Sequence, residues 1–245
     1  MNKMLKKLWN IPVIRIVLIA GLSWLVFRTA IELKTLAGFI LPDWLTADHD
    51  SFGAIFKTIL ALLSIFVMLL IPGRTLSDFG LCLPRRTNYL KLIGLTFAVT
   101  LGGLIIFAPL YMGFLSHLFG VKMQGGFDMG GSVWVMIIGI WFWSSVTEEI
   151  FNRGLLQTLL QGLEKHRFLG LSFTVWISAL LFGAAHLTVF KISSSPFFVM
   201  MIVSTAFTMG LLASWYREKT GSILPAILVH IMANVAGSLP SMLIT

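Results

Sequence analysis

Three ionisable side chains lie close together in an otherwise apolar stretch of the chain. They are Glu148, Glu149 and Arg153, within the segment SSVTEEIFNRGLLQ. Each charge near the centre of a bilayer costs about 2.5–3.5 kcal/mol on insertion scales, so these residues need partners or a function. Glu149 and Arg153 are four residues apart, which predicts an ion pair on one helix face. Glu148 is rotated by about 100° onto the face of Asn152 and Ser145, so it is predicted to face something else.

Two histidines also fall inside apolar stretches. His186 ends the segment FGAAH, and His230 opens the segment HIMAN, which ends at Asn234. A lone histidine in a membrane helix is often only hydrogen-bonded to a neighbouring helix. A helical rise of about 1.5 Å per residue puts Glu148, His186 and Asn234 roughly 20–28 Å from the basic loops, and His230 about 14 Å from them. With some helix tilt, the four side chains can meet in one cavity.

The chemistry that such a set supports is hydrolysis. A carboxylate and a neutral imidazole can hold and deprotonate a water molecule, which is the general-base half of amide hydrolysis. A second imidazole and an asparagine amide can donate hydrogen bonds to the oxyanion. Glu148, His186 and His230 also match the ligand set of a catalytic zinc site with an open position for water. The sequence lacks HExxH and GxSxG, so the commoner hydrolase signatures do not apply.

The composition indicates that membrane helices position these residues. Of the 245 residues, 18 are Lys or Arg and 10 are Asp or Glu, so 11% are charged, and 57% are apolar. Soluble domains average roughly a quarter charged residues. This excludes a soluble globular protein and a disordered chain, and the single Cys82 excludes an intrachain disulfide. We therefore predict an all-α fold, a polytopic transmembrane helical bundle.

Seven apolar stretches approach the length of about 20 residues that a membrane-spanning helix needs. They run over residues 11–33, 53–71, 90–115, 131–160, 169–190, 197–216 and 223–243. Arg28 and Glu32 compromise the first stretch but are spaced to pair on one helix face. The basic N-terminus is followed by no small-residue cleavage site, so the first span is expected to be retained. Residues 1–130 are expected to form a variable part and residues 131–245 a catalytic core, packed as one membrane domain.

The basic residues predict the orientation of this bundle. Twelve of them lie at the N-terminus and in alternate connections, whereas Lys34, Lys57, Lys122 and Lys191 are assigned to the other connections. The positive-inside rule then puts the N-terminus in the cytoplasm. The net charge of +8 is thus explained by orientation, and no nucleic-acid partner is expected.

The motifs of the C-terminal half resemble those of the CPBP family, the CAAX proteases and bacteriocin-processing enzymes, also called the Abi family. EEIFNR at Glu148 is similar to EExxxR, FGAAH at Phe182 to FxxxH, and HIMAN at His230 to HxxxN. The run FTMG at Phe207 and the run GSILPAILVH before Ile231 resemble two further blocks of the family. The resemblance covers residues 131–245, and together these motifs, in order and inside predicted spans, make a specific match.

The resemblance implies an intramembrane endopeptidase like the type II CAAX prenyl endopeptidases. It implies that Glu148 activates water with His186, that His230 and Asn234 stabilise the oxyanion, and that three further residues support the site, namely Glu149, Arg153 and Phe182. The family has been described both as metalloproteases and as metal-independent glutamate proteases. If a metal such as zinc binds, Glu148, His186 and His230 are its ligands. We favour the metal-free scheme because asparagine is a poor zinc ligand.

Partners and alternatives remain open at this stage. A peptide or lipidated-protein substrate and membrane lipids are the expected partners, in a prokaryotic inner membrane; the identity of the substrate and the oligomeric state are not determined by the sequence. One alternative is a non-catalytic immunity or scaffold protein that binds a partner through the same fold. Another is a proton-coupled transporter, which also uses buried Glu and His. Transporters commonly have paired halves, and the sequence has no internal repeat.

Overall fold

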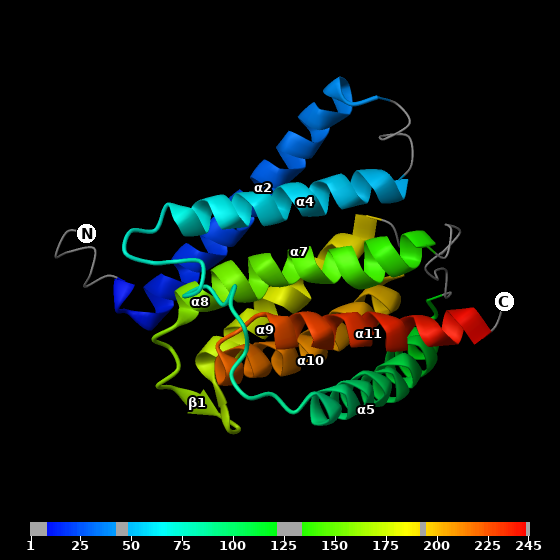
Figure 1. Cartoon of the computed structure of the whole chain (residues 1–245). Helices are drawn as coiled ribbons and strands as arrows, with labels where there is room; N and C mark the ends of the chain where they lie inside the picture. The colour runs from blue at the N-terminus through cyan, green and yellow to red at the C-terminus, as the bar shows by residue number, and fades with distance from the viewer. Residues whose placement is uncertain (1–8, 43–48, 122–133, 192–194, 244–245) are drawn as a thin grey trace.

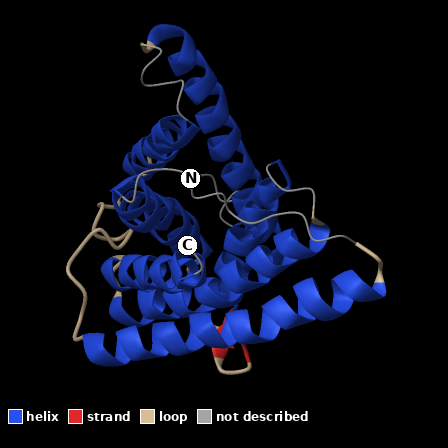
Figure 2. Cartoon of the chain, turned by 90° about the vertical axis from the view of Figure 1, so that its right-hand side faces the viewer, coloured by secondary structure: helices blue, strands red, loops and turns tan. Residues whose placement is uncertain are grey.

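Helices form nearly all of the chain that the computed structural model describes, which is residues 9–42, 49–121, 134–191 and 195–243 (Figure 1). Strands in this part of the chain form one short antiparallel hairpin (Figure 2). In chain order the first elements are α2 (Pro12–Ile40), α4 (His49–Leu69), α5 (Tyr89–Phe107), η1 (Ala108–Leu115), α6 (Ser116–Leu118), η2 (Val135–Ser144), α7 (Ser145–Glu149), η3 (Ile150–Leu156) and α8 (Gln157–Leu160). The hairpin of β1 (Arg167–Phe168) and β2 (Leu171–Ser172) follows, and then α9 (Phe173–Ala185), η4 (His186–Lys191), α10 (Pro196–Thr220) and α11 (Leu224–Leu243).

Local sequence signals explain where several of these helices begin and end. The side chains of Asn88, Ser172 and Ser195 accept hydrogen bonds from backbone N–H groups in the first turns of α5, α9 and α10. These are residue types that favour the position before a helix, because they satisfy a donor that has no partner within the helix. Helix α10 ends at Gly221, whose φ of 73° is left-handed and therefore favours glycine.

The helices are arranged in layers around a central helix. Elements η2, α7, η3 and α8 follow one another without a break over residues 135–160, and we call them together the central helix. It contacts α4 on one side and α9 and α11 on the other, while α4 also packs against α2. Helix α10 packs against α9 and α11, and α5 covers α10 and α11 (Figure 1). The central helix therefore brings its polar side chains into the middle of the bundle.

Two apolar clusters hold these layers together. The first joins α2, α4 and the central helix through residues such as Ile19, Leu60 and Leu155, which are at most 2% exposed. The second joins α5, α9, α10 and α11 and includes Phe182 and Val229. Many other large apolar side chains point outward; they include Phe39, Leu90 and Ile105, which are at least 73% exposed. An apolar outer surface of this kind suits contact with lipid rather than with water.

The prediction of a helical membrane bundle is confirmed. Of the seven predicted spans, four correspond to described helices that are long and apolar enough to cross a membrane. Among the described residues, the helices long and apolar enough to cross a membrane run over Pro12–Ile40, Tyr89–Leu118, Phe173–Phe190 and Pro196–Thr220. The apolar parts of α4 and α11 are shorter, and the central helix contains three charged residues. The chain is an integral membrane protein by these four helices; the orientation of its N-terminus stays a prediction.

Two details of the predicted spans change. The fifth was expected to begin at Leu169, but residues 169–172 belong to the hairpin, because the turn needs the left-handed Gly170 and Ser172 caps α9. Lys34 and Lys57 lie within α2 and α4, whereas the sequence assigned them to connections. Arg28 and Glu32 form the expected ion pair on an exposed face of α2. Lys122 lies outside the described residues.

Candidate active site

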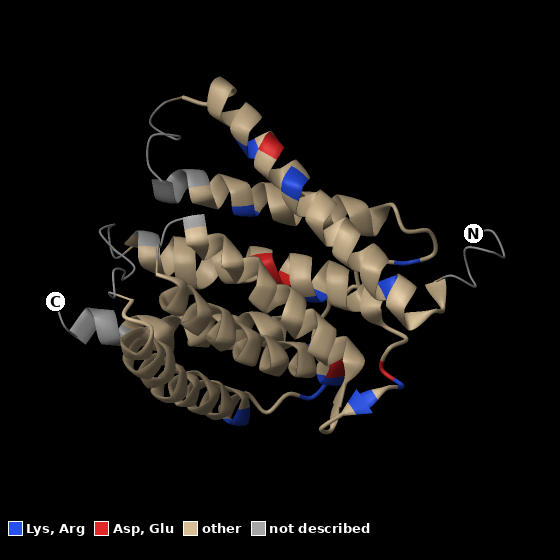
Figure 3. Ribbon diagram, turned by 180° about the vertical axis from the view of Figure 1, so that it is seen from behind, with Lys and Arg blue, Asp and Glu red and all other residues tan. Residues whose placement is uncertain are grey.

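The central helix departs from regular α-helical geometry on both sides of its two glutamates. Helix α7 carries Glu148 and Glu149 and lies between π-helical segments η2 and η3. Such π-helical turns are rare in proteins as a whole, but those that occur are often found at functional sites, because they reorient side chains relative to the rest of the helix. Acidic residues of the central helix lie inside the bundle, with basic residues beside them (Figure 3). The structure therefore gathers charged groups in the middle of an otherwise apolar bundle.

Glu149 and Arg153 form the ion pair that their spacing predicts. Arg153 Nη1 donates to Glu149 Oε1 over 3.0 Å, and both side chains are fully buried. Arg153 Nη2 also donates to the Gly210 carbonyl over 3.1 Å, and its guanidinium lies 4.4 Å from the centre of the Phe182 ring. A Cβ at Gly210 would lie 3.3 Å from Ala179 Cα, which is a tight contact, so glycine favours the close approach of α9 and α10. The pair thus ties the central helix to α9 and α10.

Glu149 also fixes the ring of His230. His230 Nδ1 lies 2.9 Å from Glu149 Oε1, the same oxygen that Arg153 contacts. An ionised carboxylate only accepts hydrogen bonds, so Nδ1 carries the proton. The other nitrogen, Nε2, then points toward Glu148 and lies 4.0 Å from its Oε2. Glu149 therefore orients His230 toward its neighbour on α7.

Glu148 has a different environment from Glu149. Its side chain is 19% exposed, and its Oε1 pairs with Lys57 Nζ of α4 over 3.0 Å and accepts from Ser144 over 2.8 Å. Lys57 also donates to the Ser144 hydroxyl. The prediction that Glu148 points away from Arg153 is confirmed, although Ser144 rather than Ser145 contacts its carboxylate. Asn152 donates to the Glu148 carbonyl over 2.8 Å, not to the carboxylate.

Lys57 is the residue that the sequence interpretation missed. A signal was present, since a lysine stands within the apolar stretch 53–71. Its assignment to a connection is wrong, because α4 continues through it and packs its side chain against α7. A charged group inside a membrane helix is expected to have a partner, and here that partner is the carboxylate of Glu148.

His186 lies beside the same site at the end of α9. Its Nδ1 is 2.9 Å from the Phe182 carbonyl, which can only accept, so Nε2 of a neutral His186 keeps its lone pair. The rings of His186 and His230 lie 4.8 and 5.4 Å from the ring of Phe182. Both imidazoles are within electrostatic reach of Glu148. Phe182 therefore packs against Arg153 and against both histidines.

Asn234 lies one turn beyond His230 on α11 and contacts the central helix instead of Glu148. Its Nδ2 donates to Ser145 Oγ over 3.1 Å and to the Ile140 carbonyl over 3.3 Å. Ser145 in turn donates to the Trp141 carbonyl over 2.6 Å. The structure thus brings Glu148, His186 and His230 together, with Asn234 at the edge of the group and held by partners of its own.

The donor set fits a metal ion poorly. In the described part of the chain, no group of three or more His, Cys, Asp or Glu side chains is arranged to hold one. The Nδ1 atoms of both histidines are engaged by Phe182 and Glu149, which leaves Nε2 of each ring as a possible ligand. The obstacle to a metal is Glu148, because one of its oxygens is engaged by the cation of Lys57. A lysine ammonium beside this carboxylate opposes binding of a second cation.

Comparison with known proteins gives one match. Residues 130–236 match a family model described as type II CAAX prenyl endopeptidase Rce1-like. This region includes the central helix, α9, α10 and most of α11, and therefore every residue of the site except Lys57. Comparisons with curated proteins and with solved structures found no match.

Proposed function

We propose that this chain, which matches the type II CAAX prenyl endopeptidase Rce1-like family over its residues 130–236, is an intramembrane endopeptidase whose base is Glu148. One observation carries the proposal: two adjacent carboxylates have opposite environments. Glu149 is fully buried and shared by Arg153 and His230, whereas Glu148 is partly exposed, lies 4.0 Å from His230 Nε2 and is within electrostatic reach of His186. Glu149 therefore supports the site, and Glu148 remains available to a water molecule.

The proposed first step is attack of water on the carbonyl carbon of the scissile bond. Glu148 Oε2 and His186 Nε2 hold the water, and Glu148 accepts its proton as the new C–O bond forms. The C–N bond then breaks, and the same proton passes from Glu148 to the leaving nitrogen. The proton and the electron pairs balance without a further reactant.

His230 and Asn234 are the proposed oxyanion donors. Glu149 holds His230 through Nδ1, so donation to the substrate has to come from a protonated Nε2. Asn234 Nδ2 would exchange its bond to Ser145 for one to the oxyanion. Loss of one such donor typically lowers kcat by about 10²–10³-fold.

The proposed substrate is a membrane-associated or lipidated peptide or protein, cleaved in a prokaryotic inner membrane. A site inside the bundle suits a substrate that reaches it from the lipid or its surface. The family name points to prenylated C-terminal peptides, and small secreted or membrane-bound peptides are the other class to be tried.

The test is cleavage of both peptide classes by the purified wild type and by Glu148→Ala. Glu32→Ala is the matched control, since this glutamate pairs with Arg28 on an exposed face of α2. We expect cleavage by the wild type and the control but not by Glu148→Ala, at equal thermal stability of all three. If no protein cleaves any peptide while a partner still binds wild type and Glu148→Ala alike, the chain is a non-catalytic binding protein and the proposal fails.

A further inference from the structure

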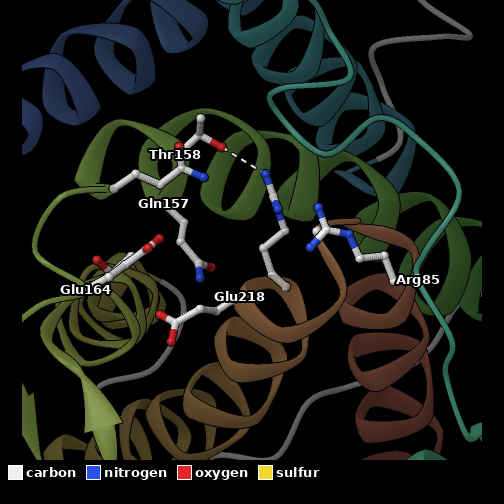
Figure 4. Close-up of a pocket in the computed structure, with 9 residues that line it drawn as sticks. Arg85, Gln157, Thr158, Glu164 and Glu218 are labelled. Atoms are coloured by element: carbon white, nitrogen blue, oxygen red, sulfur yellow. Dashed lines mark hydrogen bonds between the residues drawn. The ribbon is translucent and has the colours of Figure 1, made fainter.

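A polar cavity of about 190 Å³ lies at the end of the bundle where α8 and α10 end (Figure 4). Its lining includes Arg85, Gln157, Glu164, Arg217 and Glu218. Gln157 lies nine residues beyond Glu148 on the central helix, or roughly 13 Å along its axis, so this cavity is separate from the candidate active site. Its volume is below the roughly 300–1,000 Å³ of pockets for drug-sized ligands, which indicates a small polar ligand.

Two buried groups that line the cavity lack a partner. Among the residues that the structure describes, Gln157 Oε1 and Arg217 Nε have no hydrogen bond, although both side chains are at least 95% buried. Leaving such a group unpaired costs about 1–3 kcal/mol. One of them is an acceptor and the other a donor, so the cavity is suited to a ligand that both donates and accepts hydrogen bonds.

The charged side chains around the cavity are divided into an acidic side and a basic side. The carboxylates of Glu164 and Glu218 lie on one side, with the Gln157 amide between them, and Arg85 lies on the other side (Figure 4). Burial, and then the neighbouring charge of Glu218, raises the pKa of Glu164. Arg167 Nη2, 3.7 Å from Glu218 Oε1, offsets part of that repulsion, and a cation between the two carboxylates would offset more of it. Arg217, held by Thr158 Oγ1 over 3.1 Å, adds a second guanidinium to the cavity.

The surroundings of the cavity have the character of a membrane surface. The hairpin beside it exposes Phe168 and Leu169, which are 55% and 78% exposed, at a tight turn. Leu169 has a φ of 49°, a left-handed conformation in which asparagine or glycine is usual. The Ser172 hydroxyl of the same hairpin donates to Glu218, which links the apolar tip to the cavity. Basic residues gather at this end of the bundle (Figure 3). Together these features favour a tip inserted among lipid headgroups.

We propose that this cavity binds the phosphoethanolamine headgroup of a phospholipid. The phosphate lies against the guanidinium groups of Arg85 and Arg217, because such groups match phosphate oxygens. The primary ammonium lies between Glu164 and Glu218, beside the Gln157 amide. The acyl chains extend toward the exposed apolar tip of the hairpin. This lipid site is independent of peptide hydrolysis, and its occupancy does not depend on Glu148.

The test is lipid binding to the detergent-purified full chain, measured by native mass spectrometry. Phosphatidylethanolamine, phosphatidylcholine and phosphatidylglycerol with identical acyl chains are compared, and free phosphoethanolamine is added as a competitor. The variants Arg85→Gln and Glu164→Gln each remove one side of the site. Arg86→Gln and Glu32→Gln are the matched controls, since neither residue lines the cavity.

We expect saturable binding of phosphatidylethanolamine, weakened about tenfold by Arg85→Gln and by Glu164→Gln and unchanged in the two controls and in Glu148→Ala. Equal affinity for phosphatidylcholine refutes the assignment, because a trimethylated ammonium donates no hydrogen bond. A preference for phosphatidylglycerol that Glu164→Gln leaves intact refutes the ammonium side. Free phosphoethanolamine that binds as tightly as the lipid shows that the ligand is a soluble zwitterion and overturns the lipid assignment.

Discussion

The two adjacent glutamates give the sharpest prediction, since replacement of each by the isosteric glutamine should affect a different property. Glu149→Gln should mainly lower stability, and Glu148→Gln should mainly abolish peptide cleavage. Glu149→Gln leaves the Arg153 charge without its counter-charge at a position where both side chains are fully buried and 3.0 Å apart. Removal of one partner from a buried ion pair typically costs about 3–5 kcal/mol. For a chain of this size, roughly 2–4 °C per kcal/mol corresponds to a fall in Tm of about 6–20 °C.

Glu148→Gln should change stability far less. Its ion pair joins side chains that are 30% and 19% exposed, and such partly exposed pairs contribute about 0–1 kcal/mol. The change in Tm should therefore stay below about 4 °C. Peptide cleavage should nevertheless be abolished, because the amide of glutamine cannot accept the proton of water.

Thermal unfolding in one detergent, followed by circular dichroism, together with a peptide-cleavage assay measures both effects. The double variant Glu149→Gln/Arg153→Gln serves as a control for the pair and should recover part of the lost stability, since it leaves no uncompensated buried charge. If Glu148→Gln destabilises the protein as much as Glu149→Gln does, the division of the two carboxylates into a reacting and a supporting group is wrong.

Three further predictions concern Lys57, metal dependence and pH. Lys57→Met should lower kcat more than it raises KM, because the lysine positions Glu148 without touching substrate, and Lys57→Arg should retain most of the activity; a change in KM alone would contradict this role. Exhaustive chelation in detergent should leave peptide cleavage unchanged, whereas its abolition with rescue by zinc would overturn the metal-free scheme. The Thr75 N–H and hydroxyl donate to Asp78 Oδ2 over 2.6 and 2.8 Å and hold the pKa of Asp78 below its ordinary value. The stability that these two hydrogen bonds add is present above the unfolded pKa of Asp78, about 3.9, and is lost as the pH falls through the lower folded pKa. The difference in Tm between wild type and Asp78→Asn should therefore narrow from about pH 5 to about pH 3.

Local spacing was sufficient to predict a large part of the site. The Glu149–Arg153 pair is predicted by its spacing, because residues four apart share one face of a helix. The different direction of Glu148 is predicted by the rotation of about 100° between neighbouring residues. The π-helical segments on both sides of α7 did not disturb this relation. The end of helix α10 was predicted less well, since the helix runs to Thr220, four residues beyond the predicted limit of Tyr216, and the left-handed Gly221 follows it.

Span lengths were less predictable, because hydropathy does not distinguish a helix in lipid from one buried among other helices. The stretch 131–160 was counted as a span although it carries three charges, and the structure surrounds it with α4, α9 and α11. The stretch beginning at Leu169 is apolar enough for a helix, yet the left-handed turn at Leu169 and Gly170 makes it a hairpin.

The sequence by itself determined the class of protein, the set of chemically capable residues and the pairing within one helix, because composition and helical periodicity are local properties. The tertiary structure decided which neighbour each group received. Lys57 reaches Glu148, and His230 reaches Glu149 from 81 positions away, only because α4 and α11 pack on opposite sides of the central helix. Such contacts depend on how helices pack in three dimensions, and no spacing along the chain encodes them.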